Sequence, residues 1–558
     1  MTKYKLAILG DSTTQLIVKE LDNQAKHFNL DLELYESSFD QIEQEIKNPS
    51  SNLYTFNPDG VLLYFSVEKL QEIYFSTSLE VRHHFFQDAI NKINDLVTTL
   101  KDRLLESKIF ITNFAEMADG IYGNNANKYS EALLNSIRRI NVGLMDLSCK
   151  DSTIFILDIA LMQSIHGRKS LFDPRLYIQA SLVLSGDGVT FFSKELLNMI
   201  STSIGGAKKC LILDLDNTLW GGVIGDDGIE KIEIGSLGIG KAFTRLQQWA
   251  KTLQQRGILL AICSKNTEKV AKTPFELHPE MVLRLEDISI FVANWEDKAS
   301  NIKVIQSNLN IGFDSMVFID DNPFERALVR KIIPQVCVPE MPEDPADYVE
   351  FLSNLNLFEP GTLSTLDSER TKMIQKEIER NHLKNQFSNE SDFLKSINMI
   401  GIFDQFNQFN TPRIAQLSER SNQYNLRTIR YTEKDVEKIA SSDHQLGIAI
   451  SLRDNLGDHG LICVIVLNHG NEEIFIENWF MSCRVLKRGV EYLALNKIVE
   501  HAQNQYCKNI IGEFLPTPKN ALVKDHYQEL GFTFQGNGKW MINVEDYTPK
   551  AHYIKETV

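Results

Sequence analysis

Two aspartates that stand two positions apart directly follow a short apolar run. Residues 210–213 are apolar, Asp214 and Asp216 come next, and Thr218 completes the group. A short apolar run that ends in polar residues predicts a buried strand, and open parallel sheets bind ligands at the carboxyl ends of their strands. One carboxylate could attack phosphorus or bind a cation, while the other serves as acid or base. The pair therefore indicates phosphoryl-transfer chemistry supported by Mg²⁺.

Three further polar groups follow apolar runs later in the chain. Ser264 ends the run 257–263, Lys298 ends the segment 294–298, and an acid pair follows the run 315–319. A strand-terminal hydroxyl can hold a phosphate oxygen, a lysine can neutralise it, and paired carboxylates suit Mg²⁺. The candidate phosphate-binding residues are Thr218, Ser264, Lys265, Asn266 and Lys298. The candidate Mg²⁺ ligands are Asp214, Asp216, Asp320 and Asp321.

The order of these groups resembles that of the haloacid dehalogenase (HAD) superfamily. The resemblance implies that Asp214 attacks a phosphomonoester to give an aspartyl-phosphate. It also implies that Asp216 protonates the leaving oxygen and later activates water. The glycine-rich segment 220–228 is too short for a cap domain and predicts a hairpin flap beside the site. A site without a cap could admit a substrate that is carried on another protein.

Several segments are similar to those of FkbH-type proteins, and this resemblance covers the whole chain. They are LDLDNTLWGGVIG at 213–225, ICSKN at 262–266, FIDDNPFER at 318–326, DHGL at 458–461 and SCR at 482–484. The resemblance implies that a glyceryl unit from 1,3-bisphosphoglycerate is loaded onto an acyl carrier protein. The implied route couples dephosphorylation to acyl transfer through an enzyme thioester, with the phosphopantetheine of the carrier as acceptor.

A thioester route requires a cysteine thiolate close to the phosphate site. Cys263 directly precedes Ser264 and is the first candidate. Strand alternation could instead turn Cys263 into the core, where free cysteines commonly pack as small hydrophobes. Cys483, beside Arg484, is the second candidate. The cysteines form no C-x-x-C pair, which indicates free thiols in a reducing cytoplasm.

Residues 1–200 predict a domain in which strands alternate with helices around a parallel sheet. The strand-like runs are 6–9, 60–65, 108–113 and 153–158. Ser12, within the sequence GDS, and Asn113 resemble blocks of the SGNH hydrolases, in which that serine is the nucleophile. Leu176 stands where the histidine of that family is expected, and a serine without a base is a poor nucleophile. We expect an inactive domain that docks a partner or a neighbouring domain, with a live esterase as the alternative.

Residues 405–558 resemble the GNAT acyltransferase fold and follow a helical connector at 346–404. Strand-like runs at 448–452, 461–467, 474–480 and 509–512 accompany a helical segment at 490–502. GNAT proteins bind the pyrophosphate of coenzyme A at a helix N-terminus. The corresponding loop here keeps Arg484 and has Lys487 and Val490 at positions of small residues. A phosphopantetheine arm lacks the adenosine part and is compatible with this altered loop, and His459 is a candidate general base for thiol attack.

Length and composition set the remaining limits. The chain has 558 residues, a formal charge of −16 and 43% hydrophobic residues, which predict several ordinary domains. The negative charge argues against a nucleic-acid surface, and no apolar stretch is long enough for a membrane span. We therefore expect a cytoplasmic α/β chain with three domains. A HAD-like Rossmannoid parallel sheet at 205–345 would lie between an SGNH/flavodoxin-like and a GNAT-like α+β domain in the sequence.

Two other functions fit the same residues. A plain HAD phosphatase would act on a small phosphoester and would ignore a carrier protein. A carrier-binding scaffold would recruit carrier proteins through its end domains and would have no use for the Mg²⁺ carboxylates.

Overall fold

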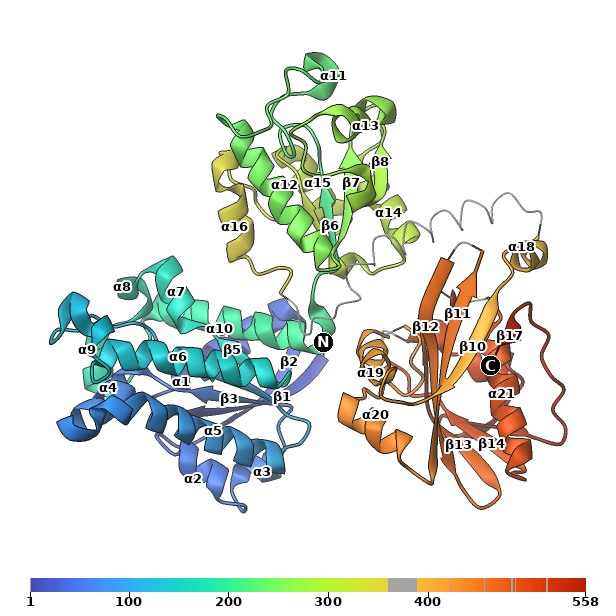
Figure 1. Cartoon of the computed structure of the whole chain (residues 1–558), viewed down its shortest axis with the longest axis horizontal. Helices are drawn as coiled ribbons and strands as arrows, with labels where there is room; N and C mark the ends of the chain where they lie inside the picture. Colours follow the sequence, from blue (N-terminus) through green and yellow to red (C-terminus); the bar gives the residue numbers. More distant parts are fainter. Residues whose placement is uncertain are drawn as a thin grey trace. The chain divides into compact units, whose positions relative to one another are not determined.

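The computed structural model describes residues 2–359, 389–421, 423–455, 457–482, 485–486, 488–517 and 520–557. These residues form three sheets (Figure 1), and the apolar cores on each sheet come from one stretch of the chain alone. The expected mixed α/β class with parallel sheets is confirmed. Much of the predicted connector lies outside the described residues, and its described ends contain α16 (Tyr348–Asn354) and α18 (Glu390–Ser396). None of the described helices is both long and apolar enough to cross a membrane.

The first sheet is parallel and has the strand order β2-β1-β3-β4-β5, with helices on both faces (Figure 1). Its strands are β1 (Thr2–Gly10), β2 (Leu30–Glu36), β3 (Gly60–Tyr64), β4 (Lys108–Thr112) and β5 (Ile154–Leu157). Its long helices are α1 (Gln15–Gln24), α4 (Val67–Ser76), α5 (Phe85–Arg103), α6 (Leu133–Lys150) and α10 (Gly186–Ser201). Four of the strands coincide with the predicted runs. The strand β2 was not predicted, because this edge strand alternates apolar residues with acids and has no continuous apolar run.

The second sheet is parallel and has the strand order β8-β7-β6-β9. Its strands are β6 (Cys210–Leu213), β7 (Leu259–Ser264), β8 (Ile288–Ala293) and β9 (Met316–Ile319). The helices around it are α12 (Gly240–Gln255), α13 (Glu268–Leu277), α14 (Lys298–Leu309) and α15 (Pro323–Ile332). Because apolar clusters cover both faces of this sheet, all residues of β6, β7 and β9 are buried. Polar side chains can therefore collect only at the strand ends.

The third sheet is mixed and has the strand order β15-β16-β14-β13-β12-β11-β10-β17. Its strands are β10 (Ile400–Gln405), β11 (Gln445–Asp454), β12 (Gly457–His469), β13 (Glu473–Met481), β14 (Asn509–Glu513), β15 (Thr533–Gly536), β16 (Lys539–Asn543) and β17 (Lys555–Thr557). The helices α19 (Thr411–Arg420), α20 (Glu433–Ala440) and α21 (Val490–Asn504) pack against it. The parallel pair β13 and β14 is connected through α21, whereas β11, β12 and β13 pair antiparallel. This is the α+β architecture expected for the end of the chain.

Candidate active site

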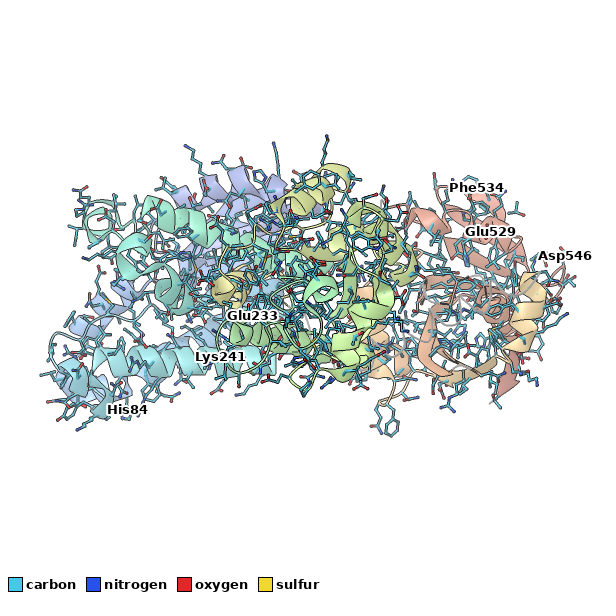
Figure 2. All side chains as sticks on the ribbon, turned by 90° about the horizontal axis from the view of Figure 1, so that it is seen from above. His84, Glu233, Lys241, Glu529, Phe534 and Asp546 are labelled. Atoms are coloured by element: carbon cyan, nitrogen blue, oxygen red, sulfur yellow. The ribbon has the colours of Figure 1, made fainter. Side chains whose placement is uncertain are left out.

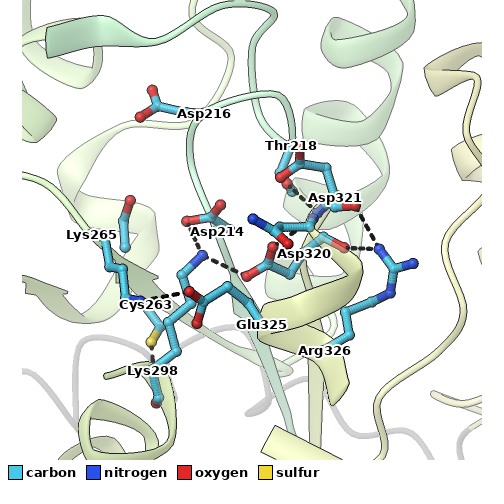
Figure 3. A network of polar contacts seen from close by, with 12 residues as sticks. Asp214, Asp216, Thr218, Cys263, Lys265, Lys298, Asp320, Asp321, Glu325 and Arg326 are labelled. Atoms are coloured by element: carbon cyan, nitrogen blue, oxygen red, sulfur yellow. Dashed lines mark hydrogen bonds and ion pairs between the residues drawn. The ribbon is translucent and has the colours of Figure 1, made fainter. Parts of the chain in front are cut away.

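The predicted phosphoryl-transfer residues come together at the carboxyl edge of the second sheet. Asp214 follows β6, Ser264 ends β7, and Asp320 follows β9. Lys298 begins α14, directly after the loop that leaves β8. Because these strands are parallel, their carboxyl ends lie at one edge of the sheet. Figure 3 shows Asp214, Lys298 and Asp320 close together there.

A buried lysine lies between two of the aspartates. Lys298 Nζ is 2.9 Å from Asp214 Oδ1 and 2.5 Å from Asp320 Oδ2. All three residues are buried. Burial raises the pKa of Asp214 to about 6, although Lys298 opposes this change, and burial also raises the pKa of Asp320. Burial disfavours the lysine charge, but the two carboxylates hold the pKa of Lys298 above its ordinary value. The site therefore keeps a positive charge where a phosphate oxygen could bind.

Three carboxylates form a cluster that suits a divalent cation. One oxygen atom from each of Asp214, Asp320 and Asp321 lies within 4.8 Å of the other two. A set of carboxylate oxygens is what Mg²⁺ prefers, and the ammonium of Lys298 already stands against two of them. The main chain behind the acid pair is fixed by Arg326, whose Nη1 donates to the carbonyl oxygens of Asp320 and Asp321 at 2.8 and 2.7 Å. The donor set of this structure fits Mg²⁺.

The side chain of Asp216 does not join this cluster, and the listing of Asp216 among the Mg²⁺ ligands stays a prediction. Its Oδ1 accepts hydrogen bonds from Trp220 Nε1 at 2.9 Å and from the backbone N–H of Ile224 at 3.0 Å. Its Oδ2 accepts one from Asn266 Nδ2 at 2.7 Å. Figure 3 shows the carboxylate apart from the other acids. The physical reason is that the flap and the loop after β7 supply these donors, and they hold the side chain away from the cluster.

The expected flap is present as a paired segment. The backbone groups of Gly221 and Glu233 exchange hydrogen bonds of 3.0 and 2.9 Å, and the short helix α11 (Ile224–Asp227) lies between them. An open cavity of about 410 Å³ adjoins this flap and is lined by Asp321 and by the exposed Glu233, which is labelled in Figure 2. Its other lining residues include Asn217, Phe243, Pro342 and Tyr348. The acid cluster is thus reachable from a space bounded by the flap.

The remaining phosphate-binding candidates lie around the same edge. Ser264 Oγ accepts a hydrogen bond from Asn266 Nδ2 at 3.3 Å, and Thr218 Oγ1 accepts one from the backbone N–H of Asp321 at 3.2 Å. Lys265 Nζ lies 2.6 Å from Glu325 Oε1. The ammonium of Lys265 is therefore already neutralised by a carboxylate.

Glu325 and Arg326 were not singled out from the sequence. Both are buried, and they contact Lys265 and the main chain of the acid pair, respectively. The sequence signal for them was their place four and five residues after Asp321, in the segment 318–326.

Cys263 lies in the core. It is 0% exposed and belongs to the apolar cluster on one face of the sheet. Its Sγ donates a 3.7 Å hydrogen bond to the carbonyl oxygen of Lys298, and burial raises the pKa of the thiol. The reason is that helices cover both faces of this sheet, so strand alternation does not bring Cys263 to the surface. An acyl group would have to reach a buried thiol there.

The SGNH-like residues lie in the first sheet. Ser12 follows β1 and is only 2% exposed, and Asn113 Nδ2 donates to Asp158 Oδ1 at 2.7 Å. Burial raises the pKa of Asp11 to about 7. Within the described residues, no hydrogen bond joins Ser12 to a histidine, and the ring of His166 stacks on Phe191 at 3.9 Å. This arrangement agrees with the prediction of a domain without esterase activity, which stays a prediction.

The third sheet contains His459, whose Nε2 lies 2.9 Å from Asp454 Oδ2. Asp454 was not predicted, because the side chain ends a strand and no motif marked it. The other two candidates from this part of the sequence, Cys483 and Arg484, lie outside the described residues.

An aspartate at the end of the central strand, a strand-terminal serine, a lysine and an acid pair define the class of HAD-type phosphatase domains. A model of the FkbH N-terminal domain matches residues 5–201. The N-terminal part of the protein BF1531 from Bacteroides fragilis, which contains a phosphatase domain and was solved in complex with Mg, is 44% identical to this chain. The match has a TM-score of 0.62 and covers 65% of this chain and 95% of that structure. The chain belongs to the FkbH family.

A second solved structure matches a smaller part of the chain. The ribosomal-protein-S18-alanine N-acetyltransferase from Escherichia coli is 11% identical, with a TM-score of 0.22, over 27% of this chain and 99% of that structure. No curated protein matches the chain.

Proposed function

We propose that this chain is a Mg²⁺-dependent HAD-type phosphatase with Asp214 as its nucleophile. The observation that carries the proposal is the buried cluster in which Asp214, Asp320 and Asp321 meet Lys298. The relative from Bacteroides fragilis, solved with Mg, supports the choice of metal. Asp214, Asp320 and Asp321 would hold Mg²⁺, which when bound supplies positive charge against the phosphate oxygens.

Each of these residues has its own role in the proposed reaction. An Asp214 oxygen attacks phosphorus, the bond from phosphorus to the leaving oxygen breaks, and Asp216 gives that oxygen a proton. A water molecule then attacks the aspartyl-phosphate, Asp216 takes its proton, and the Asp214 carboxylate is restored. Ser264 and Lys298 hold phosphate oxygens meanwhile. Asp216 has to leave Trp220 and Asn266 to reach the leaving oxygen, so the flap takes part in each turnover.

We also propose that the substrate is a phosphoglyceryl donor, 1,3-bisphosphoglycerate, whose 3-phosphate is removed through Asp214. An enzyme thiol attacks the C1 carbonyl carbon and the C1 phosphate leaves. The glyceryl unit then passes to the phosphopantetheine thiol of an acyl carrier protein, and the enzyme thiol is restored. Membership of the FkbH family supports this step, and so does the open cavity beside Asp321, which could admit a long arm. The enzyme thiol that would carry the acyl group is Cys263 or Cys483. The burial of Cys263 favours Cys483. The proposed location is the cytoplasm.

Phosphate release tests the first part of this proposal. The full chain with Mg²⁺ and 1,3-bisphosphoglycerate should release the 3-phosphate, and Asp214→Asn should lower the rate of that release by at least about 1,000-fold. The C1 phosphate, which leaves when a thiol is acylated, is counted separately. Asp314→Asn, a substitution of an exposed aspartate in the same domain, is the matched control and should keep the wild-type rate. Release that persists in Asp214→Asn would refute the assigned nucleophile, and no release by the wild type would favour a scaffold.

Intact-protein mass spectrometry of the same mixture tests the second part. We expect a dephosphorylated glyceryl adduct that disappears in one of the variants Cys263→Ala and Cys483→Ala. Phosphate release without any adduct would leave a plain phosphatase that acts on a small phosphoester.

A further inference from the structure

A histidine and an aspartate form a buried pair in the third sheet, far along the sequence from the phosphatase residues. His459 Nε2 lies 2.9 Å from Asp454 Oδ2, and the two side chains are 8% and 0% exposed. In the tautomer that carries its hydrogen on Nε2, the ring donates that hydrogen to Asp454 and has its basic lone pair on Nδ1. The carboxylate fixes the tautomer and the ring orientation, as in other histidine bases that are oriented by a carboxylate.

The strand that ends at Asp454 is irregular just before this residue. The pairing of β11 with β12 shifts register between Ile450 and Ser451 and again between Leu452 and Arg453. Register shifts of this kind re-aim side chains and are frequent beside active sites. On the partner strand, Gly460 directly follows His459 and has a φ of +61°, a conformation that glycine adopts at no steric cost. The backbone is therefore irregular beside both Asp454 and His459.

A positively charged side chain borders the same pair. Arg488 is buried, and its Nη1 lies 3.9 Å from Asp454 Oδ2. An opposite charge this close favours the charged form of the aspartate.

We propose that Asp454 and His459 form a second active site, which activates a thiol for acyl transfer; this inference rests on the proposed function. His459 takes the proton of the thiol through Nδ1, and the thiolate attacks the carbonyl carbon of an acyl thioester. The bond to the donor sulfur breaks, and His459 returns the proton to the departing thiolate. One carbon–sulfur bond forms and one breaks. His459 is the catalytic residue, and Asp454 is a positioning residue that acts through it.

A thiol-exchange assay separates this site from the phosphatase site. The full chain is mixed with the N-acetylcysteamine thioester of glyceric acid as donor and pantetheine as acceptor, and the pantetheine thioester is measured by mass spectrometry. His459→Ala should lower the exchange rate by about 100-fold or more, because general base catalysis typically contributes that much. Asp454→Asn should lower it as well, through loss of the correct tautomer. Phosphate release from 1,3-bisphosphoglycerate should stay within about twofold of wild type in both variants, because the phosphatase residues are untouched.

His469→Ala is the matched control. His469 lies on the same strand, β12, and its ring is also hydrogen-bonded, at 2.8 Å to His501 Nε2. This variant should keep both activities. A more acidic acceptor thiol, trifluoroethanethiol, distinguishes a catalytic role of His459 from a purely structural one. It should reduce the defect of His459→Ala, because a thiol that ionises by itself needs no base.

A further variant in the same assay tests which thiol attacks the donor thioester. Loss of exchange in Cys483→Ala would show that a cysteine of this chain is acylated first, whereas unchanged exchange would show direct use of the acceptor thiol. Equal exchange by wild type and His459→Ala would overturn this inference alone. No exchange by the wild type, together with normal phosphate release, would overturn acyl transfer itself and this inference with it.

Discussion

Lys298 is the residue on which the charge balance of the phosphatase site depends. It is 3% exposed and faces two buried carboxylates, at 2.9 and 2.5 Å. Breaking a buried ion pair from one side leaves an uncompensated charge, which typically costs 3–5 kcal/mol. The same ammonium is the one proposed to meet a phosphate oxygen, so stability and activity share one side chain.

Replacement of Lys298 should therefore affect both the activity and the stability of this domain. Lys298→Met should abolish phosphate release and lower the free energy of unfolding of this domain by about 3 kcal/mol at neutral pH without Mg²⁺. The loss should shrink near pH 5, because Asp214, whose pKa is raised to about 6, can then be protonated. Urea unfolding measures the loss, and Lys272→Met, which removes an exposed pair with Glu268 on α13, should change it by less than about 1 kcal/mol. A stable Lys298→Met protein at neutral pH would contradict the assigned charge balance.

The raised pKa of Asp214 gives a second prediction at this scale. Burial raises this pKa from 3.8 to about 6, so the native state binds the proton more tightly than the unfolded chain does. The metal-free protein should lose stability as the pH rises through that window. Mg²⁺ requires the deprotonated carboxylate, so the rise in Tm that it causes should be larger at about pH 7.5 than at about pH 5. Calorimetry checks this, and Asp214→Asn should remove most of the difference; a rise in Tm independent of pH would be the contrary result.

At the scale of elements, the flap decides where Asp216 lies. The flap supplies two of the three donors that hold the Asp216 carboxylate, Trp220 Nε1 and the backbone N–H of Ile224. Gly222, between them, has a φ of +89°, in a region where a Cβ atom is strained.

Gly222→Ala should therefore disturb the flap and lower kcat for phosphate release on the order of 10-fold, because small displacements of catalytic groups are costly. Gly257→Ala is a matched control. The φ of Gly257 is +88°, so an alanine there meets the same backbone strain. Gly257 precedes the amino end of β7, whereas the site residue Ser264 ends that strand. This variant should lose comparable stability and keep kcat. If both variants lose kcat equally, the flap has no special part in turnover.

The sequence predicted those parts of the site that lie directly at strand ends. Asp214, Ser264 and Asp320 each follow a short apolar run, and parallel pairing alone brings such ends together. The position of the Asp216 side chain could not be predicted in this way, because it depends on hydrogen bonds from two separate loops. The pairing of His459 with Asp454 depends on the register of a hairpin. The burial of Cys263 depends on helices that cover both faces of its sheet.

At the scale of the whole molecule, the apolar cores follow the order of the chain. The two clusters on the phosphatase sheet contain only residues between 210 and 358. The cluster on the first sheet lies between residues 4 and 200, and the two on the third sheet lie between residues 393 and 554. Each part buries its own apolar side chains, which is the property expected of an independent domain.

This separation predicts that residues 208–358 fold without the rest of the chain. The fragment should unfold cooperatively and release phosphate with a kcat within about threefold of the full chain, because every proposed phosphatase residue lies inside it. It should not catalyse thiol exchange, since it lacks Asp454 and His459. Circular dichroism and the two assays check these outcomes. A fragment that is unfolded would show that the predicted domain boundaries are wrong.

In the proposed reaction, Asp214 carries the phosphoryl group during turnover. The most direct measurement is peptide mass spectrometry after rapid acid quenching of the full chain with Mg²⁺ and 1,3-bisphosphoglycerate. We expect a phosphoryl group on the peptide that contains Asp214, formed only with Mg²⁺ and absent in Asp214→Asn. Rapid phosphate release without any phosphorylated Asp214 peptide, or a phosphoryl group on another residue, would contradict it.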